Sequence, residues 1–168
     1  RICYGIVLPG PDQEEGIPII QGGDCQPDKL SWEQLSKTTP EKAAEYERSK
    51  LEEGDLVYEI RGSVGRVVEV PPELAGANLS RDTARISPRD NVDTTWLKYA
   101  LRSEPFRQQM EFHTHGAAVE GVKLADLRDG LLPVPSLDEQ REIAEKAVQI
   151  DNRINRLNEA VAEEISLL

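Results

Sequence analysis

The stretch GDLVYEIRGSVGRVVEV (54–70) predicts a β-hairpin near the middle of the chain. Its two runs, 55–61 and 64–70, alternate and are rich in β-branched residues, which is typical of paired strands. Gly62-Ser63 lies at the bend, and Gly65 follows it. Glycine at such positions favours a tight turn between the two strands.

Arg61 and Arg66 flank this bend, although the chain carries a formal net charge of −11. The acidic residues are unevenly spread. Residues 1–60 hold 6 Lys/Arg against 13 Asp/Glu, and residues 133–168 hold 4 against 8. Residues 61–107 hold 8 Lys/Arg against 6 Asp/Glu. The middle of the chain is therefore the part that repels a phosphate backbone least.

The length of 168 residues fits one domain, or one domain with an appendage. No run approaches the ~18 apolar residues of a membrane span, and no export signal is visible. The chain begins at Arg1 and its single methionine is Met110, so we expect a fragment or a processed product. Cys3 and Cys25 are far apart, which favours two reduced, buried thiols in a cytoplasmic protein.

Short strands and helices surround the hairpin. Strands are expected at 2–8, 17–21, 77–79, 83–86 and 131–134. Helices are expected from the capping pattern Thr38–Glu41 to Leu51, over 92–103 after Asn91, and from Pro105 to about His113. Gly116 and Gly121 mark a loop. The mixture predicts an α+β fold, with a small twisted β-sheet and flanking helices.

A long helix is expected at the C-terminus, from about 137 to 168. Ser136–Glu139 has capping-box spacing, and neither Gly nor Pro follows it. Apolar residues then recur at alternating spacings of 4 and 3, which is the heptad seam of a coiled coil. The seam is Ile143, Ala147, Ile150, Ile154, Leu157 and Val161. A helix of about 30 residues is ~45 Å long, so we expect it to project and to pair with another helix. The alternative is that it lies on its own domain.

Few residues form motifs that are typical of enzymes or metal sites. A common metal-dependent nuclease motif requires an acidic residue two positions before a lysine, and no lysine of this chain has one. The Asn-Pro-Pro-aromatic motif of amino-methyltransferases is also absent from the sequence, as are a Gly-x-Gly-x-x-Gly motif and a phosphate loop. His113-Thr114-His115 is the one metal-like pair, and its possible co-ligands, Cys3 and Cys25, are distant in sequence. An exposed loop pair is favoured over a metal site. We expect no cofactor, no metal and no enzyme that acts alone.

Several segments together resemble the specificity subunit of type I restriction–modification systems. They are PIIQGGD (18–24), LEEGDLVY (51–58), RGSVGR (61–66), ANLS (77–80) with ISP (86–88), Gly116 with 122–127, and LPVPSLDEQR (132–141). The resemblance covers nearly the whole chain. Its most telling parts are the Gly-Asp hairpin and the Pro-x-Pro-x-Leu-x-Glu-Gln-Arg junction.

The resemblance implies a DNA target-recognition domain over 1–132 and a conserved-region coiled-coil helix over 133–168. Such subunits hold two recognition domains, each reading one half of a split DNA sequence, and two helices that pair as an antiparallel coiled coil. They have no catalytic centre and bind a methyltransferase subunit and a translocase–nuclease subunit. This chain holds one recognition domain and one helix. We therefore expect half of a longer subunit, or a half-sized subunit that dimerises through its helix.

Double-stranded DNA is the expected ligand, and no membrane partner is expected. Arginine can donate two hydrogen bonds to guanine, each good pair giving roughly 1–3 kcal/mol of discrimination, and glycines let a backbone approach the duplex closely. The candidate contacts are Lys37, Thr38 and Thr39 before the first helix, Arg61, Ser63 and Arg66 at the hairpin, Arg81 and Arg85, and the loop pair His113 and His115.

Three alternatives stay open. Arg61 and Arg66 could be ordinary solvent-facing residues paired with Glu59 or Glu69. The chain could be a coiled-coil protein-interaction adaptor without DNA binding, for which the charge of −11 is the main argument. It could also be the recognition portion of a fused restriction enzyme.

Overall fold

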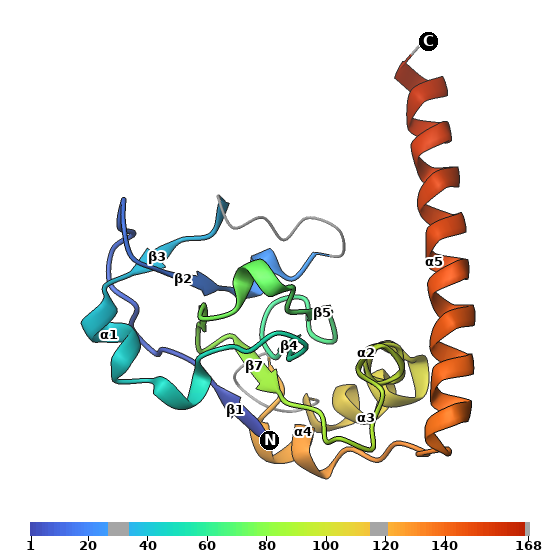
Figure 1. Ribbon diagram of the computed structural model, residues 1–168, viewed down its shortest axis with the longest axis horizontal. Helices are drawn as coiled ribbons and strands as arrows, with labels where there is room; N and C mark the ends of the chain where they lie inside the picture. The colour runs from blue at the N-terminus through green and yellow to red at the C-terminus, as the bar shows by residue number, and fades with distance from the viewer. Residues whose placement is uncertain (27–33, 115–120, 167–168) are drawn as a thin grey trace.

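The predicted hairpin lies in the larger of two β-sheets. In this computed structural model, which describes residues 1–26, 34–114 and 121–166, β4 (Leu56–Glu59) pairs antiparallel with β5 (Val67–Glu69). On its other side β4 pairs with β7 (Thr83–Ile86), and β7 pairs with β1 (Ile2–Tyr4). The strand order is β1-β7-β4-β5, antiparallel throughout (Figure 1). The hairpin thus contributes a central strand as well as an outer one.

A smaller sheet lies beside it. β2 (Ile17–Ile20) pairs antiparallel with β3 (Lys37–Thr38) and parallel with β6 (Asn78–Leu79). Short helical elements connect the strands. They are the α-helix α1 (Pro40–Ala44) and the 3₁₀ helices η1 (Gly22–Asp24), η3 (Glu47–Ser49) and η4 (Pro72–Leu74).

The hairpin strands separate two hydrophobic cores. Successive side chains of a strand point to opposite faces of the sheet, and here both faces are covered. Tyr58 and Val67 belong to one core, which also contains Phe106, Met110 and other residues from the helices after β7. Val57 and Val68 belong to the other, with residues of η4 and the smaller sheet. Because both faces of the sheet are covered, every residue from 56 to 60 is buried, and buried residues do not alternate with exposed ones there.

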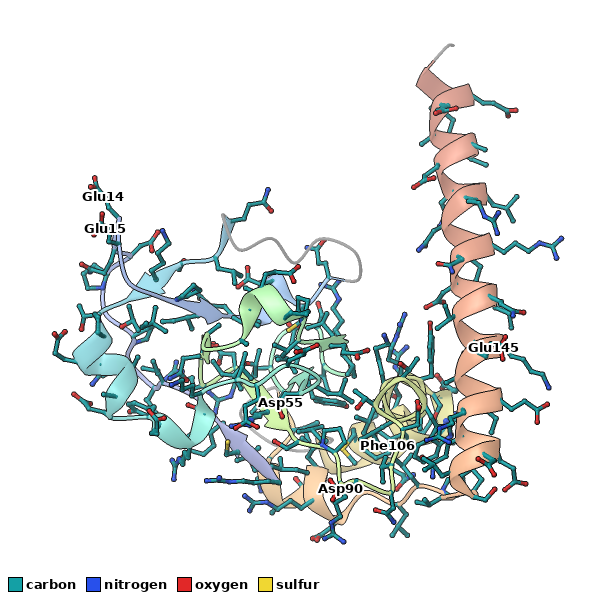
Figure 2. The ribbon with its side chains drawn as sticks, viewed as in Figure 1. Glu14, Glu15, Asp55, Asp90, Phe106 and Glu145 are labelled. Atoms are coloured by element: carbon teal, nitrogen blue, oxygen red, sulfur yellow. The ribbon has the colours of Figure 1, made fainter. Side chains whose placement is uncertain are left out.

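Three helices cover the first face: α2 (Thr94–Arg102), α3 (Glu104–Thr114) and α4 (Leu124–Asp129). The Asp93 carboxylate accepts a hydrogen bond from the Trp96 N–H at 2.8 Å and so caps α2. Phe106 of α3 meets the Tyr58 ring edge-on, with the ring centroids 6.3 Å apart. Figure 2 shows Phe106 in the crowded region between α2 and α3.

The long helix α5 (Leu137–Ser166) confirms the predicted C-terminal helix. Its capping box forms as the sequence indicates: the Ser136 N–H donates to the Glu139 carboxylate at 2.9 Å, and the Glu139 N–H donates to the Ser136 hydroxyl at 3.4 Å. Figure 1 shows α5 rising from the domain beside α2, with its C-terminal half standing clear. Every residue from 156 to 165 is exposed.

Several sequence expectations were wrong in detail. The helix expected from Thr38 to Leu51 is only the short α1 followed by η3, and Thr39, not Thr38, caps it by accepting the Lys42 N–H. The strand expected over 2–8 covers only β1, no strand forms over 131–134, and α4 was not foreseen. The expected strand at 83–86 is confirmed as β7.

Both cysteines are free and buried, as predicted. Burial raises the pKa of each thiol above its ordinary value. In the parts of the chain that the structure describes, no helix combines the length and the apolar character needed to cross a membrane.

Candidate nucleic-acid interface

The hairpin tip is a defined loop between β4 and β5. The Glu59 N–H donates to the Arg66 carbonyl at 2.9 Å, and the Gly65 N–H donates to the Glu59 carbonyl at 3.1 Å. Gly62 and Gly65 have φ angles of 83° and 91°, which other residues rarely adopt. The bend falls at Gly62-Ser63, as the sequence predicts, but the loop is longer than a two-residue turn.

A buried carboxylate supports this tip from below. Glu59 is only 3% exposed, and its Oε1 accepts the Ser63 backbone N–H at 2.7 Å. A Cβ atom at Gly62 would lie 2.7 Å from the same oxygen, so a side chain there would both clash and strain the backbone. Burial raises the pKa of Glu59. The tip is therefore held in one conformation, with Ser63 and Arg66 exposed on its outer side.

Arg61 and Arg81 share one acidic neighbour. The guanidinium of Arg61 lies 3.4 Å from the Asp82 carboxylate, and that of Arg81 lies 3.8 Å from the same oxygen. All three side chains are substantially exposed. An exposed ion pair of this kind is weak, so the two guanidinium groups can turn to another anion. The two arginines and the one aspartate leave this patch with a formal charge of +1.

Arg66 belongs to a second basic group that sequence reasoning missed. An open cleft of about 450 Å³ lies beside the tip, and Arg66, Arg102 and Arg107 line it together with residues 63–65 and Val67. Arg107 of α3 packs close to Gly65, where a Cβ atom would lie in ordinary contact, 3.5 Å from the Arg107 Cγ. The one available signal was the excess of basic residues over 61–107.

The expected pairing of the hairpin arginines with Glu59 or Glu69 does not form. Glu59 instead accepts the Ser63 N–H, and Glu69 pairs with Lys98 at 3.1 Å. Arg61 pairs with Asp82.

Two expected contact residues are buried inside the domain. The Arg85 side chain lies 2.7 Å from the Asp55 carboxylate and donates to the Lys50 carbonyl, and it is 7% exposed. Figure 2 shows Asp55 well inside the domain. Thr38 is fully buried and its hydroxyl donates to the Pro9 carbonyl at 2.7 Å. Both side chains make contacts inside the domain, so neither is available to contact a DNA duplex in this structure.

The other expected residues do not join the tip. Lys37 Nζ donates to the Glu14 carbonyl at 2.9 Å, and Thr39 caps α1. Figure 1 shows β3 and α1 on the side of the domain that faces away from α5. His115 lies outside the described residues, and for His113 only the backbone, in α3, is described. Among the described residues no group of three or more His, Cys, Asp or Glu could hold a metal ion.

The apolar seam of α5 forms a second candidate surface. Ile143 is 45% exposed, Ile150 60% and Leu157 59%, and Ile154 and Val161 are similarly open. Large apolar side chains exposed in a row along a projecting helix mark a surface that binds another protein element. The alternative, in which the helix lies on its own domain along this seam, is not what the structure shows.

The fold and these two surfaces define a module with a basic hairpin tip and a separate long helix whose apolar seam is exposed. The family model of the type I restriction modification DNA specificity domain matches residues 11–167. The chain therefore belongs to that family.

Relatives and solved structures agree with this membership. The specificity subunit of the Escherichia coli type I restriction enzyme EcoBI is 30% identical over 166 residues, covering 96% of this chain and 35% of that protein. The MjaVIII specificity subunit of Methanocaldococcus jannaschii is 24% identical, covering 84% of this chain and 34% of that protein. The chain spans about a third of the length of these curated relatives.

The same fold occurs in two solved structures. The crystal structure of the HsdS subunit from Thermoanaerobacter tengcongensis gives a TM-score of 0.68 at 22% identity, over 95% of this chain and 37% of that one. A structure of a type I R-M system, described for its complex assembly and conformational transition, gives a TM-score of 0.67 at 24% identity, over 96% of this chain and 38% of that one. The predicted α+β fold with a long C-terminal helix is confirmed.

Proposed function

We propose that this chain supplies sequence-specific DNA recognition to a type I restriction–modification complex. Residues 1–132 would form the target-recognition domain and 133–168 the pairing helix. The observation that carries the proposal is the arginine-bearing tip, held rigid by Glu59, in a chain that a DNA specificity domain matches over 11–167. Catalysis belongs to partner subunits in this proposal, a methyltransferase and a translocase–nuclease.

The proposed DNA contacts are drawn from the basic and polar side chains around the tip. Arg61, Ser63, Arg66 and Arg81 remain from the sequence prediction, and Arg107 is added because it lines the cleft beside Arg66. Arginines in such positions can pair bidentately with guanine or bind phosphates. The net charge of −11 limits attraction to arbitrary DNA, so binding depends on fitted contacts at this one face.

Pairing through α5 is the second part of the proposal. Burying a large apolar side chain stabilises an assembly by roughly 1.5–3 kcal/mol, and the exposed seam offers several such side chains. The partner would be the second helix of a complete subunit or, where the chain acts alone, a second copy. The seam would then be the coiled-coil interface, with Ala147 between the larger residues.

The test is methylation of the target site by a complete subunit assembled with its methyltransferase. Arg61→Ala and Arg66→Ala should each lower the rate of methylation about fivefold or more, since a lost base contact costs roughly 1–3 kcal/mol. Arg89→Ala is the matched control, because Arg89 is an exposed arginine that does not line the cleft. If both tip variants methylate the target at the wild-type rate, the tip is framework and does not read DNA.

An adaptor without DNA binding is the second candidate, favoured by the net charge of −11. It predicts that the assembled subunit pairs through α5 but shows no preference for any duplex sequence. Binding assays with random-sequence duplexes would separate the two candidates, because a recognition subunit enriches one sequence from such a pool.

A further inference from the structure

The attachment of α5 to the domain rests on two polar contacts on one face of the helix. The first involves Gln140, which is 1% exposed. Its side-chain oxygen accepts the Asp93 backbone N–H at 2.8 Å, and its side-chain nitrogen donates to the Pro135 carbonyl at 2.9 Å. The same nitrogen lies 3.5 Å from the Asn91 carbonyl. One amide thus joins the start of α5 to the segment that begins α2.

The second contact lies three helical turns further along. The Asp151 carboxylate accepts the Tyr99 hydroxyl at 2.7 Å and lies 3.4 Å from the Arg102 guanidinium. Both partners come from the C-terminal half of α2. Between the two contacts Ala144 is buried, and its small side chain lets the helices approach closely. Figure 1 shows α2 beside this part of α5.

These contacts and the apolar seam are centred on neighbouring faces of α5, about 80° apart. At about 100° per residue, Gln140, Ala144 and Asp151 project within about 40° of one another. Of the seam, Ile143, Ile150 and Leu157 are turned roughly a quarter of a circle or more from the centre of these contacts, whereas Ala147, Ile154 and Val161 are turned by about 40–80°. The helix can therefore hold its own domain and a partner helix at the same time, and the first contact sets the direction in which the seam faces.

We propose that Gln140 and Asp151 are positioning residues that fix the angle at which α5 leaves the recognition domain. This inference rests on the proposed function. In a paired assembly, that angle sets where the second recognition domain lies relative to the first. It thereby sets the separation of the two DNA half-sites that one assembly can contact together.

Geometry shows why two contacts are needed. A helix held at one point can swing about it, whereas contacts 11 residues apart, or about 16 Å along the axis, define its direction. A tilt of about 10° would displace the far end of a ~45 Å helix by about 8 Å. That is about two base pairs at ~3.4 Å each. Loss of the Asp151 contact should therefore lower the preference for one spacer length between the half-sites.

The experiment uses a complete subunit with its methyltransferase and duplexes whose half-sites are separated by the native spacer or by one base pair more or fewer. Tyr99→Phe removes only the hydroxyl that meets Asp151, and Asp151→Asn removes only the charge. We expect each to lower the preference for the native spacer at least fivefold, while preference among half-site sequences stays at the wild-type level. Glu145→Gln is the control for charge on exposed α5.

A second measurement does not depend on DNA. Because Cys3 and Cys25 are buried, Cys residues placed at exposed Glu41 on α1 and Glu159 on α5 can be spin-labelled selectively. With unlabelled chain in excess, the distance distribution should be narrow in the parent and broader or shifted in both variants. Unchanged distributions together with unchanged spacer preference would overturn the inference. Loosened distances in a chain that binds no DNA would instead overturn the proposed function alone.

Discussion

Two arginines near the middle of the chain have opposite environments. Arg66 and Arg85 both lie in the one basic stretch of the chain, and both are predicted DNA contacts. Arg66 is exposed at the hairpin tip, whereas Arg85 is buried in β7 against Asp55. The apolar neighbours Ala84 and Ile86 hint at a buried strand. Nothing local shows that Asp55, thirty residues earlier, is placed to pair with Arg85.

The burial of Arg85 leads to a prediction about stability. Arg85→Ala should lower the free energy of unfolding by about 3–5 kcal/mol, because removing one partner of a buried ion pair leaves the Asp55 charge uncompensated. The measurement is urea unfolding of the parent and the variant, followed by circular dichroism. Arg81→Ala is the matched control, since Arg81 is exposed and makes only a long contact with Asp82.

The control should change the unfolding free energy by less than about 0.5 kcal/mol, as is usual for surface substitutions. A similar loss for both variants would show that the chain's arginines do not divide into structural and surface groups as described. An Arg85→Ala chain of parental stability would place Arg85 among the available DNA contacts again.

At the scale of elements, the sequence was most informative where a local signal and the tertiary environment agreed. The hairpin, β7 and α5 were predicted because turn glycines, β-branched residues and the Ser136–Glu139 capping box act over a few residues. The helix expected up to Leu51 was predicted too long, because Thr38 is taken into β3 and Ser49 bonds the buried Asn78. Such distant partners leave no pattern in the adjacent sequence.

The seam of α5 gives a prediction about association. Ile150→Asp with Ile154→Asp should convert a dimer of this chain into a folded monomer, because each Asp would place a charge in the apolar interface. Sedimentation equilibrium measures the change. The matched control is Gln149→Asp with Ala162→Asp, which adds the same charge on exposed faces away from the seam.

The control variant should dimerise as the parent does, with antiparallel helices as the family resemblance implies. A parent chain that stays monomeric at high concentration would show that the seam does not pair two copies. A complete subunit would then be needed to supply the second helix.

At the scale of the whole molecule, function depends on surfaces assembled from distant segments. The cleft beside the tip combines Arg66 of the hairpin with Arg102 of α2 and Arg107 of α3. Arg107 packs beside Gly65 at the tip. Sequence reasoning identified the basic middle of the chain, but packing of three elements decides which arginines face the same space. The sequence therefore predicted the kind of site but only some of the residues that form it.

The charge of the whole chain predicts how the chain binds DNA by itself. The net charge is −11, and four exposed or partly exposed arginines lie around the tip, Arg61, Arg66, Arg81 and Arg107. We therefore expect weak, salt-sensitive binding, in the range of about 10⁻⁴–10⁻⁶ M that is typical of non-specific contacts. Each phosphate contact contributes about −0.9 to the slope of log K against log salt, so that slope should be no steeper than about −4. Tight, specific binding should require the second recognition domain and the methyltransferase.

Fluorescence anisotropy of a labelled duplex, titrated at several salt concentrations, measures this slope. Arg66→Ala should make it shallower by about 1, because one phosphate or base contact is lost. Arg153→Ala, an exposed arginine on α5, removes the same charge far from the tip and should leave the slope unchanged. Equal effects of the two variants would mean that the duplex responds only to net charge and not to the tip. Nanomolar binding by the free chain would mean that one recognition domain suffices for tight DNA binding, so that a paired assembly is not required for it.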